Sequence, residues 1–183
     1  MDIEGRLVRL RAFREEDAPR VAELLADPRV GAYLDHWART PYTLQQAREF
    51  VALPSSITAD VRWAIECVED GALLGATGLH DIDHVNRHAT WGIWTGPPER
   101  WGRGYGTEAC RLAVGYAFRH LGLRKVQLYV YAGNDRGRRA YVKAGFETEG
   151  VYRRHYWIDG ALVDVETMAV FADNPLYAGA PGS

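Results

Sequence analysis

The chain has 183 residues, of which 47% are hydrophobic and 25% are charged, and its formal net charge is −2. This length and composition are typical of one globular domain and exclude a chain that is disordered throughout. No apolar run reaches the roughly 18 residues that a membrane-spanning helix needs, so we expect no membrane partner. The small net charge also argues against nucleic acid as a partner.

Positive charge is concentrated in residues 97–156, which hold 12 Lys and Arg against 5 Asp and Glu. The rest of the chain holds 10 basic and 19 acidic residues. We therefore expect the segment 97–156 to meet a negatively charged ligand and the remainder to suit a cationic one. Chance clustering of surface charges is the alternative interpretation.

The first predicted elements are a strand and two helices. Residues 6–13 alternate between apolar and polar side chains, which predicts a strand. Acidic residues followed by Pro19 indicate the start of a short helix. Thr43 and Gln46 match a capping box, which predicts a second helix over residues 41–53.

Strands dominate the middle of the chain. Residues 61–68 and 72–80 flank a Glu-Asp-Gly turn and predict a hairpin, which a strand at 89–95 follows. Residues 107–121 are apolar on two faces and predict a helix that is packed on both sides. A strand, a short helix and two strands across an Asp-Gly turn are expected after it, at residues 125–132, 135–144, 146–158 and 162–171.

This order of elements predicts a mixed α/β (α+β) fold with helices packed on a partly antiparallel sheet. We expect a single domain over residues 1–172 and a flexible tail over 173–183, which is rich in small residues, Pro and Gly. Cys67 and Cys110 lie in apolar segments and are expected in the core as free thiols. The start MDIEGRLVRL lacks the order of a signal peptide, so we expect a cytoplasmic protein.

Three histidines have a spacing that could suggest a metal site. His80, His84 and His88 recur every four residues, which would align them on a helix. They lie instead in a polar connection between two predicted strands, where that spacing has no meaning. We therefore expect no metal.

The most informative segment is WGRGYGTEA at residues 101–109, between a predicted strand and a predicted helix. Gly102, Gly104 and Gly106 let the backbone adopt positive φ and let a ligand come close. The helix start that follows offers unpaired N–H groups and the positive end of the helix dipole. This combination favours a phosphate or a pyrophosphate.

Three phosphate-binding loops compete for this segment. A nucleotide P-loop requires Gly-Lys-Ser/Thr, which is absent. A dinucleotide loop requires G-x-G-x-x-G with an acidic residue about 20 positions later. This chain has G-x-G-x-G, with Lys125 and Gln127 in the acidic region. The pyrophosphate of coenzyme A is the third candidate ligand, and a glycine-rich turn without any ligand stays open.

The sequence resembles the GNAT superfamily of acetyl-CoA-dependent N-acetyltransferases over about residues 5–171. It is most similar to the RimJ/RimL-like branch, which acetylates the N-termini of ribosomal proteins. The resemblance rests on GIWTGP, WGRGYGTEA, the Asn134–Tyr141 spacing, Gly145-Phe146 and VDVETMAV at 163–170. The family motif for pyrophosphate is Gln/Arg-x-x-Gly-x-Gly/Ala, and Trp101 departs from its first position. The resemblance implies a GNAT-type fold, with a mostly antiparallel twisted sheet of about seven strands and helices on both faces.

The resemblance also implies acetyl-CoA as the co-substrate. The strand edge of Ile93, Trp94 and Thr95 would pair with the pantetheine arm, and Asn134 would bond that arm near its thiol. Arg138 would reach a CoA phosphate, as would Arg139, and Gly137 stands where the family often has Ser or Ala. Backbone amides would hold the pyrophosphate, within the loop residues Trp101, Gly102, Arg103, Gly104, Tyr105, Gly106 and Thr107.

The resemblance implies one residue for the general acid and leaves several candidates for the general base. Tyr141 matches the family's general acid, which protonates the leaving CoA thiolate when an amine attacks the thioester directly. Simple core packing is the alternative for Tyr141. Thr90 stands where many relatives carry a glutamate base. The candidate bases are therefore His80, Glu66 and Asp81, or a water chain that ends on one of them.

The acceptor would be a primary amine, and the resemblance favours the α-amine of a protein N-terminus. A small amine such as an aminoglycoside, a polyamine or an amino-acid derivative stays open, as does a non-catalytic acyl-CoA-binding domain. A monomer and a homodimer are both compatible with the sequence. A cationic acceptor would suit acidic residues near strand ends, namely Asp81, Asp83, Asp159, Asp164 and Glu166. Aromatic residues that could line its cleft are Trp37, Trp91, Tyr152, Tyr156 and Trp157.

Overall fold

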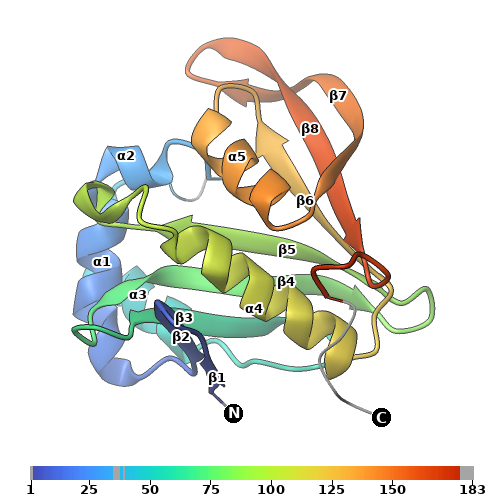
Figure 1. Cartoon of the computed structure of the whole chain (residues 1–183). Helices are drawn as coiled ribbons and strands as arrows, with labels where there is room; N and C mark the ends of the chain where they lie inside the picture. The colour runs from blue at the N-terminus through green and yellow to red at the C-terminus, as the bar shows by residue number, and fades with distance from the viewer. Residues whose placement is uncertain (1, 35–37, 39, 178–183) are drawn as a thin grey trace.

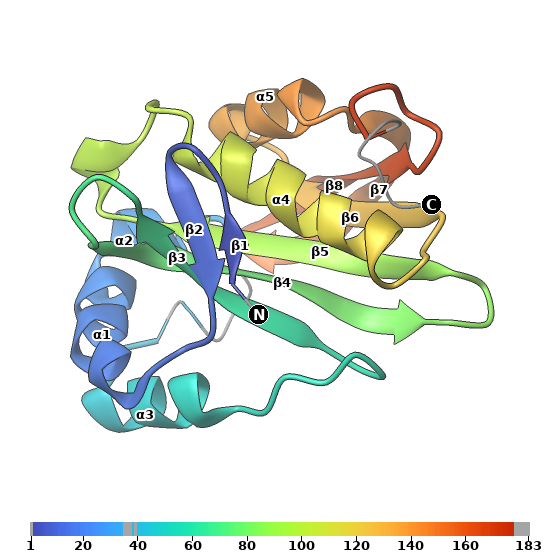
Figure 2. The ribbon, with the colours of Figure 1, turned by 60° about the horizontal axis from the view of Figure 1, so that its bottom comes forward.

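The computed structural model describes residues 2–34, 38 and 40–177. In this part of the chain, eight strands form a sheet in the order β1-β2-β3-β4-β5-β6-β8-β7, and helices cover both faces (Figure 1, Figure 2). The strands are β1 (Ile3–Glu4), β2 (Val8–Arg11), β3 (Val61–Cys67), β4 (Leu73–Asp83), β5 (His88–Thr95), β6 (Lys125–Tyr131), β7 (Glu147–Ile158) and β8 (Ala161–Phe171). The helices are α1 (Ala18–Ala26), α2 (Pro28–Gly31), α3 (Leu44–Ala52), α4 (Tyr105–Arg119) and α5 (Asp135–Lys143), with short 3₁₀ turns η1 (Glu15–Asp17) and η3 (Pro98–Arg100).

The expected mostly antiparallel sheet with helices on both faces is confirmed, with eight strands in place of about seven. The additional strand is β1, which pairs with β2. With two residues, β1 is too short to show a periodic pattern in the sequence. Helix α2 was also not predicted, because one turn leaves no apolar period. At α3 the capping box is confirmed, since the side chains of Thr43 and Gln46 each accept the other's backbone N–H.

The two faces of the sheet have separate cores. On the side of α4 and α5, buried side chains such as Trp63, Leu79 and Trp91 pack against the small residues of α4. On the side of α1 and α3, Ala64 and Trp94 pack against buried residues of both helices. Because side chains alternate along a strand, neighbouring residues of β3, β4 and β5 serve opposite cores. We call these faces the α4/α5 side and the α1/α3 side.

The sheet opens at one place. Strands β5 and β6 are parallel and pair only from His88–Lys125 to Thr90–Gln127. Beyond Thr90 they diverge, with β6 running toward α5 and β8 while β5 continues along β4 (Figure 1). The rest of β5 therefore has an edge that β6 does not cover.

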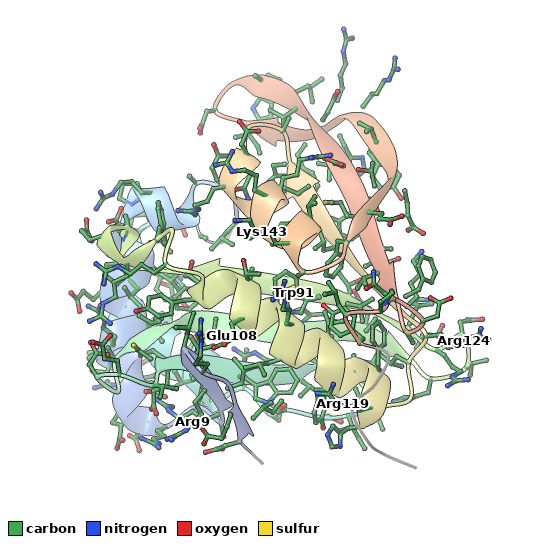
Figure 3. The ribbon with its side chains drawn as sticks, viewed as in Figure 1. Arg9, Trp91, Glu108, Arg119, Arg124 and Lys143 are labelled. Carbon is green, nitrogen blue, oxygen red and sulfur yellow. The ribbon has the colours of Figure 1, made fainter. Side chains whose placement is uncertain are left out.

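Helix α4 is fixed to the start of the chain by one carboxylate. Glu108 accepts the backbone N–H groups of Arg6, Leu7 and Val8, at 3.1, 2.6 and 2.8 Å. Figure 3 shows Glu108 on α4 where the helix passes the β1–β2 turn. These bonds position the first turn of α4, which directly follows the glycine-rich loop.

Residues 173–177, which the sequence places in a flexible tail, end in an anchored aromatic residue. Tyr177 is 9% exposed, and its hydroxyl donates to the carbonyl of Ala144 at 2.6 Å. Its ring also meets Phe118 of α4 edge-on, with centroids 5.4 Å apart. Burial of an aromatic ring thus anchors this segment, and residues 178–183 lie outside the described residues. Within the described chain, no helix combines the length and the apolar character needed to span a membrane.

Candidate active site

A cleft of about 800 Å³ opens where β5 and β6 diverge. Its lining comes from both faces of the sheet. Gly104, Thr107 and Tyr141 line it from the α4/α5 side, whereas Arg62 and His80 line it from the α1/α3 side. Two ligands that enter from opposite faces can therefore meet in the gap.

The glycine-rich loop forms one end of this cleft. Gly102 and Gly104 have φ of +79° and +91°, a region that favours glycine. Gly104 is the N-cap of α4 and contributes no side-chain bond, so the first amides of the helix lack the intrahelical partners that later amides have. These N–H groups and the helix dipole make an anion site that fits a pyrophosphate. Arg103 is not among the residues that line the cleft, and the expected role of its backbone amide stays a prediction.

Trp101 links this loop to the end of β5. Its indole Nε1 donates to the carbonyl of Thr95 at 2.8 Å, so that carbonyl is already bonded within the chain. The guanidinium carbon of Arg136 lies 3.3 Å from the centroid of the Trp101 ring, a cation–π contact. Burial lowers the pKa of Arg136. Arg136 lines the cleft, and the sequence analysis did not single it out.

Arg138, which was expected at a CoA phosphate, lies elsewhere. Its Nε and Nη2 donate to the carboxylate of Glu166 at 2.8 and 3.1 Å, and it does not line the cleft. The fold thus pairs Arg138 with Glu166 and does not bring it into the cleft. Arg139 and Lys143 line the cleft beside Arg136, so α5 still presents positive charge there.

Asn134 and Tyr141 lie at the two ends of the expected spacing on α5. Asn134 caps the helix, because its side-chain oxygen accepts the N–H of Gly137 at 3.0 Å. A Cβ at Gly137 would stand 2.7 Å from the Asn134 amide nitrogen, so Ser or Ala here would require the Asn134 side chain to shift. Tyr141 meets Trp91 edge-on, with centroids 5.5 Å apart. Burial raises the pKa of the Tyr141 phenol.

On the α1/α3 side, the strand register places side chains in rows. Arg62 of β3, Gly78 of β4 and Gly92 of β5 are cross-strand partners, so they share one face. The imidazole of His80 lies over the two glycines, with Nε2 at 3.2 and 3.6 Å from the positions that a Cβ at Gly78 and at Gly92 would take. The paired glycines thus leave a floor on which the ring rests.

Charge next to this ring comes from the loop before β3. Oδ1 of Asp60 lies 3.7 Å from Nδ1 of His80, and Asp60, Arg62 and His80 all line the cleft. Arg62 stacks over the ring of Phe50 at 4.2 Å and donates to its carbonyl at 3.0 Å. Burial lowers the pKa of Arg62.

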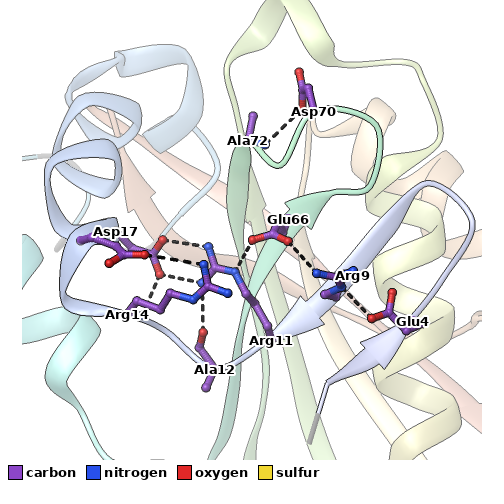
Figure 4. Close-up of polar contacts among 10 residues, drawn as sticks. Glu4, Arg9, Arg11, Ala12, Arg14, Asp17, Glu66, Asp70 and Ala72 are labelled. Atoms are coloured by element: carbon purple, nitrogen blue, oxygen red, sulfur yellow. Dashed lines mark hydrogen bonds and ion pairs between the residues drawn. The ribbon is translucent and has the colours of Figure 1, made fainter.

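Glu66, another candidate base, is a structural residue. It lies on β3 away from the cleft and is 8% exposed. Its carboxylate accepts from Nε of Arg11 at 2.5 Å and from Nη1 of Arg9 at 3.2 Å (Figure 4). Arg11 in turn bonds both oxygens of Asp17. The sequence could not reveal this network, because its members come from three separate segments.

Asp81, the remaining candidate base, does not line the cleft either. Its backbone N–H donates to Oδ1 of Asp60 at 3.2 Å, so it contributes through its main chain. The other acidic residues expected at strand ends are absent from the cleft lining too: Asp83, Asp159, Asp164 and Glu166. Among the aromatic candidates Trp91 and Tyr156 line the cleft, Tyr152 and Trp157 do not, and Trp37 lies outside the described residues.

The three spaced histidines have separate partners. His80 faces Asp60, His84 bonds the carbonyl of Ile57 at 2.6 Å, and His88 lies 3.8 Å from Asp83. In the described part of the chain, no group of three or more His, Cys, Asp or Glu side chains is arranged to hold a metal ion.

The comparison that decides the family is a match of residues 7–147 to the acetyltransferase (GNAT) domain. The chain belongs to the GNAT acetyltransferase family. It is accordingly an acetyl-CoA-dependent N-acetyltransferase, and the glycine loop, the start of α4 and the uncovered edge of β5 fit this co-substrate. The residues expected to bind it that do line the cleft are Ile93, Trp94, Thr95, Trp101, Gly102, Gly104, Tyr105, Gly106, Thr107 and Asn134.

Relatives of this GNAT protein differ in their named acceptors. It is 34% identical over 164 residues to the putative ribosomal N-acetyltransferase YdaF of Bacillus subtilis, covering 86% of this chain and 87% of that protein. It is 32% identical over 170 residues to spermidine N(1)-acetyltransferase of Escherichia coli, covering 90% and 86%. The crystal structure of spermidine N-acetyltransferase from Vibrio cholerae, in complex with CoA and spermine, superimposes with a TM-score of 0.80 at 25% identity and covers 96% of this chain and 100% of that one.

Proposed function

We propose that this enzyme acetylates the α-amine of a polypeptide N-terminus, as RimJ/RimL-like enzymes do. The charge of the acceptor half of the cleft carries the proposal. Asp60 is the one carboxylate among the described lining residues, and the cation Arg62 lies on the same α1/α3 side. A polyamine carries several ammonium groups, and each would need an opposite charge or a hydrogen-bond acceptor when it is bound.

The shape of the α1/α3 side also supports a peptide acceptor. Opposite His80 and Arg62, the cleft is lined by the tyrosines Tyr129, Tyr131 and Tyr156 of β6 and β7. Tyr131 and Tyr156 pack edge-on at 5.1 Å, which makes a rigid aromatic wall. Such walls, with a few polar groups beside them, suit the apolar and amide surface of an extended peptide.

In the proposed mechanism, the acceptor enters from the α1/α3 side and acetyl-CoA supplies the thioester from the α4/α5 side. His80 takes the proton of the amine, because it is the one candidate base that lines the cleft. The N–H of Ile93 or of Trp94, whichever faces the uncovered edge of β5, polarises the carbonyl. Tyr141 donates its proton to the departing thiolate, since its raised pKa keeps the phenol protonated at neutral pH.

A polyamine acceptor is the second candidate. It is favoured by the similarity to spermidine N(1)-acetyltransferase, which spans nine tenths of this chain. With a polyamine, Asp60 would be the group that receives one of the ammonium charges.

The deciding experiment is the release of CoA thiol from acetyl-CoA over an acceptor panel. The panel holds N-terminal peptides, their N-acetylated forms, spermidine, spermine and an aminoglycoside. We expect the free peptides to have the highest kcat/KM and their N-acetylated forms to be inactive. Preference for spermidine or spermine would replace the proposal with the second candidate. Stabilisation by acetyl-CoA without thiol release on any acceptor would contradict both.

A further inference from the structure

Strand β4 carries an irregularity immediately after His80. The register with β5 shifts between His80 and Asp83. Asp81 has a φ of +50°, a left-handed conformation that residues other than glycine adopt uncommonly. Conformations of this kind persist only where the surroundings impose them, and they cluster at functional sites. We therefore looked for the contacts that hold this conformation and for its effect on the neighbouring His80.

The cause is a set of bonds to the loop before β3. The N–H of Asp81 donates to Oδ1 of Asp60, and the N–H of Ile82 donates to the carbonyl of Ala59 at 3.1 Å. The left-handed residue turns its amide toward the Asp60 carboxylate. Asp60 is thereby held in place by the same strand that presents His80.

The consequence is a carboxylate placed beside one ring nitrogen. Oδ1 of Asp60 is 3.7 Å from Nδ1 of His80, and their side chains are 49% and 41% exposed. The imidazole rests on the floor of Gly78 and Gly92, with Nε2 facing β5. One nitrogen thus faces the carboxylate, while the other lies over Gly78 and Gly92 at the wall of the cleft.

We propose that Asp60, held by the β4 bulge, is a positioning residue that keeps the Nδ1 hydrogen of His80 toward its carboxylate and leaves Nε2 free to accept a proton. This inference rests on the proposed role of His80 as the base. In the reaction, Nε2 takes the proton of the acceptor amine, and the lone pair of that amine forms the bond to the acetyl carbon. The carbon–sulfur bond breaks, and the thiolate receives the hydroxyl proton of Tyr141.

Three other charged or titratable groups line the cleft with His80, namely Arg62 of β3, Tyr129 of β6 and Tyr156 of β7, and Asp81 follows His80 along β4. Burial, followed by the charge of Tyr152, raises the pKa of Tyr129. Tyr129 is therefore neutral wherever a histidine titrates. Of the described carboxylates, Asp60 is the one that lies within 4 Å of His80, so its charge acts most directly on the imidazolium.

Asp60→Asn is the sharpest test, because asparagine keeps an oxygen for the N–H of Asp81 and loses the charge. We expect kcat/KM near neutral pH to fall by about 10- to 100-fold, part of what a general base contributes. We also expect ¹⁵N NMR of the imidazole to show the Nδ1–H tautomer in the wild type and less of it in Asp60→Asn.

Asp81→Gly is the matched control. Glycine adopts a φ of +50° without strain and keeps the backbone N–H, so activity and the pH profile should match the wild type. His80→Gln should abolish the acidic limb. Each variant is first checked for wild-type acetyl-CoA affinity and thermal stability, and the profile is measured with whichever acceptor the panel selects. The test therefore does not depend on the acceptor class.

The outcomes separate the two proposals. A slower Asp60→Asn enzyme whose imidazole keeps the wild-type tautomer in ¹⁵N NMR would overturn the positioning role and leave Asp60 as a structural support for the bulge. An unchanged limb in His80→Gln would remove the base proposed above. Should Asp60→Asn fail to fold, ¹⁵N NMR of the wild-type imidazole decides, because the Nδ1–H tautomer supports the inference and the Nε2–H tautomer contradicts it.

Discussion

The two sides of the cleft are built in different ways. The α4/α5 side offers backbone groups, from Gly102 to the first turn of α4 and along the edge of β5. The α1/α3 side offers side chains, with Asp60 and Arg62 near one strand end and His80 on the next strand. A site made of backbone tolerates changes of side chain, such as Trp101 in the pyrophosphate motif. A site made of side chains can change its substrate through single substitutions.

The largest expected effect concerns Tyr141, the α4/α5 residue whose side chain takes part in the proposed proton transfer. Tyr141→Phe keeps the ring against Trp91 and removes the hydroxyl, so kcat should fall by about 10²- to 10⁴-fold. Stopped-flow or steady-state thiol release measures this change, and the Kd of acetyl-CoA should not change. Near-normal kcat would assign Tyr141 to core packing.

The dependence of activity on pH gives a second test of Tyr141 as the general acid. Burial raises the pKa of Tyr141, so the acid stays protonated until the pH exceeds the ordinary tyrosine value of about 10. Activity should therefore show no loss from this group between pH 7 and pH 10. A basic limb centred near pH 8 that Tyr141→Phe abolishes would contradict the direction of the shift.

A substitution of Glu66 tests whether this residue stabilises the fold and takes no part in the α1/α3 site. Glu66→Gln breaks the nearly buried ion pair with Arg11, which should lower the free energy of unfolding by about 3 kcal/mol. For a chain of this size that corresponds to a fall in Tm of about 6–12 °C. Urea unfolding and calorimetry measure it.

The matched control for Glu66 is Glu4→Gln, which removes an exposed partner of Arg9. Its ion pair at 2.6 Å has side chains that are 37% and 60% exposed, so the loss should stay below about 1 kcal/mol. The pH–rate profile of folded Glu66→Gln enzyme should match the wild type. A displaced acidic limb would return Glu66 to the list of bases.

Gly104 tests how far the α4/α5 side depends on backbone conformation. A side chain at φ +91° costs about 1–2 kcal/mol, and Gly104→Ala should distort the amides at the start of α4. We expect the Kd of acetyl-CoA, measured by calorimetry, to rise by about 10- to 100-fold as pyrophosphate bonds are lost. Gly71→Ala places the same strain at φ +71° in the β3–β4 turn, with open space around it. That control should lose stability and keep the wild-type Kd.

The sequence predicted what depends on local pattern. Strand alternation, the Thr43 cap and the glycine spacing each lie within a few residues, so the elements and the pyrophosphate loop could be inferred. Asp60 carries no such signal, because a turn residue before a strand has many uses. Its role arises only when the loop and the β4 bulge come together. Glu66 was misassigned for the same reason, since its partners Arg9 and Arg11 lie more than fifty positions away.

The arginines of α5 give the smallest expected effect. Arg136 and Arg138 are two positions apart, so on a helix they point about 200° from each other, and the sequence cannot tell which one faces the cleft. Arg136→Ala removes the cation over Trp101 and should raise the KM for acetyl-CoA by about 3- to 10-fold. Arg138→Ala breaks only the bond to Glu166, so its KM should match the wild type. Saturation curves for acetyl-CoA at fixed acceptor compare the two. The reverse order would mean that α5 turns when the co-substrate binds, so that Arg138 and not Arg136 faces the cleft in the complex.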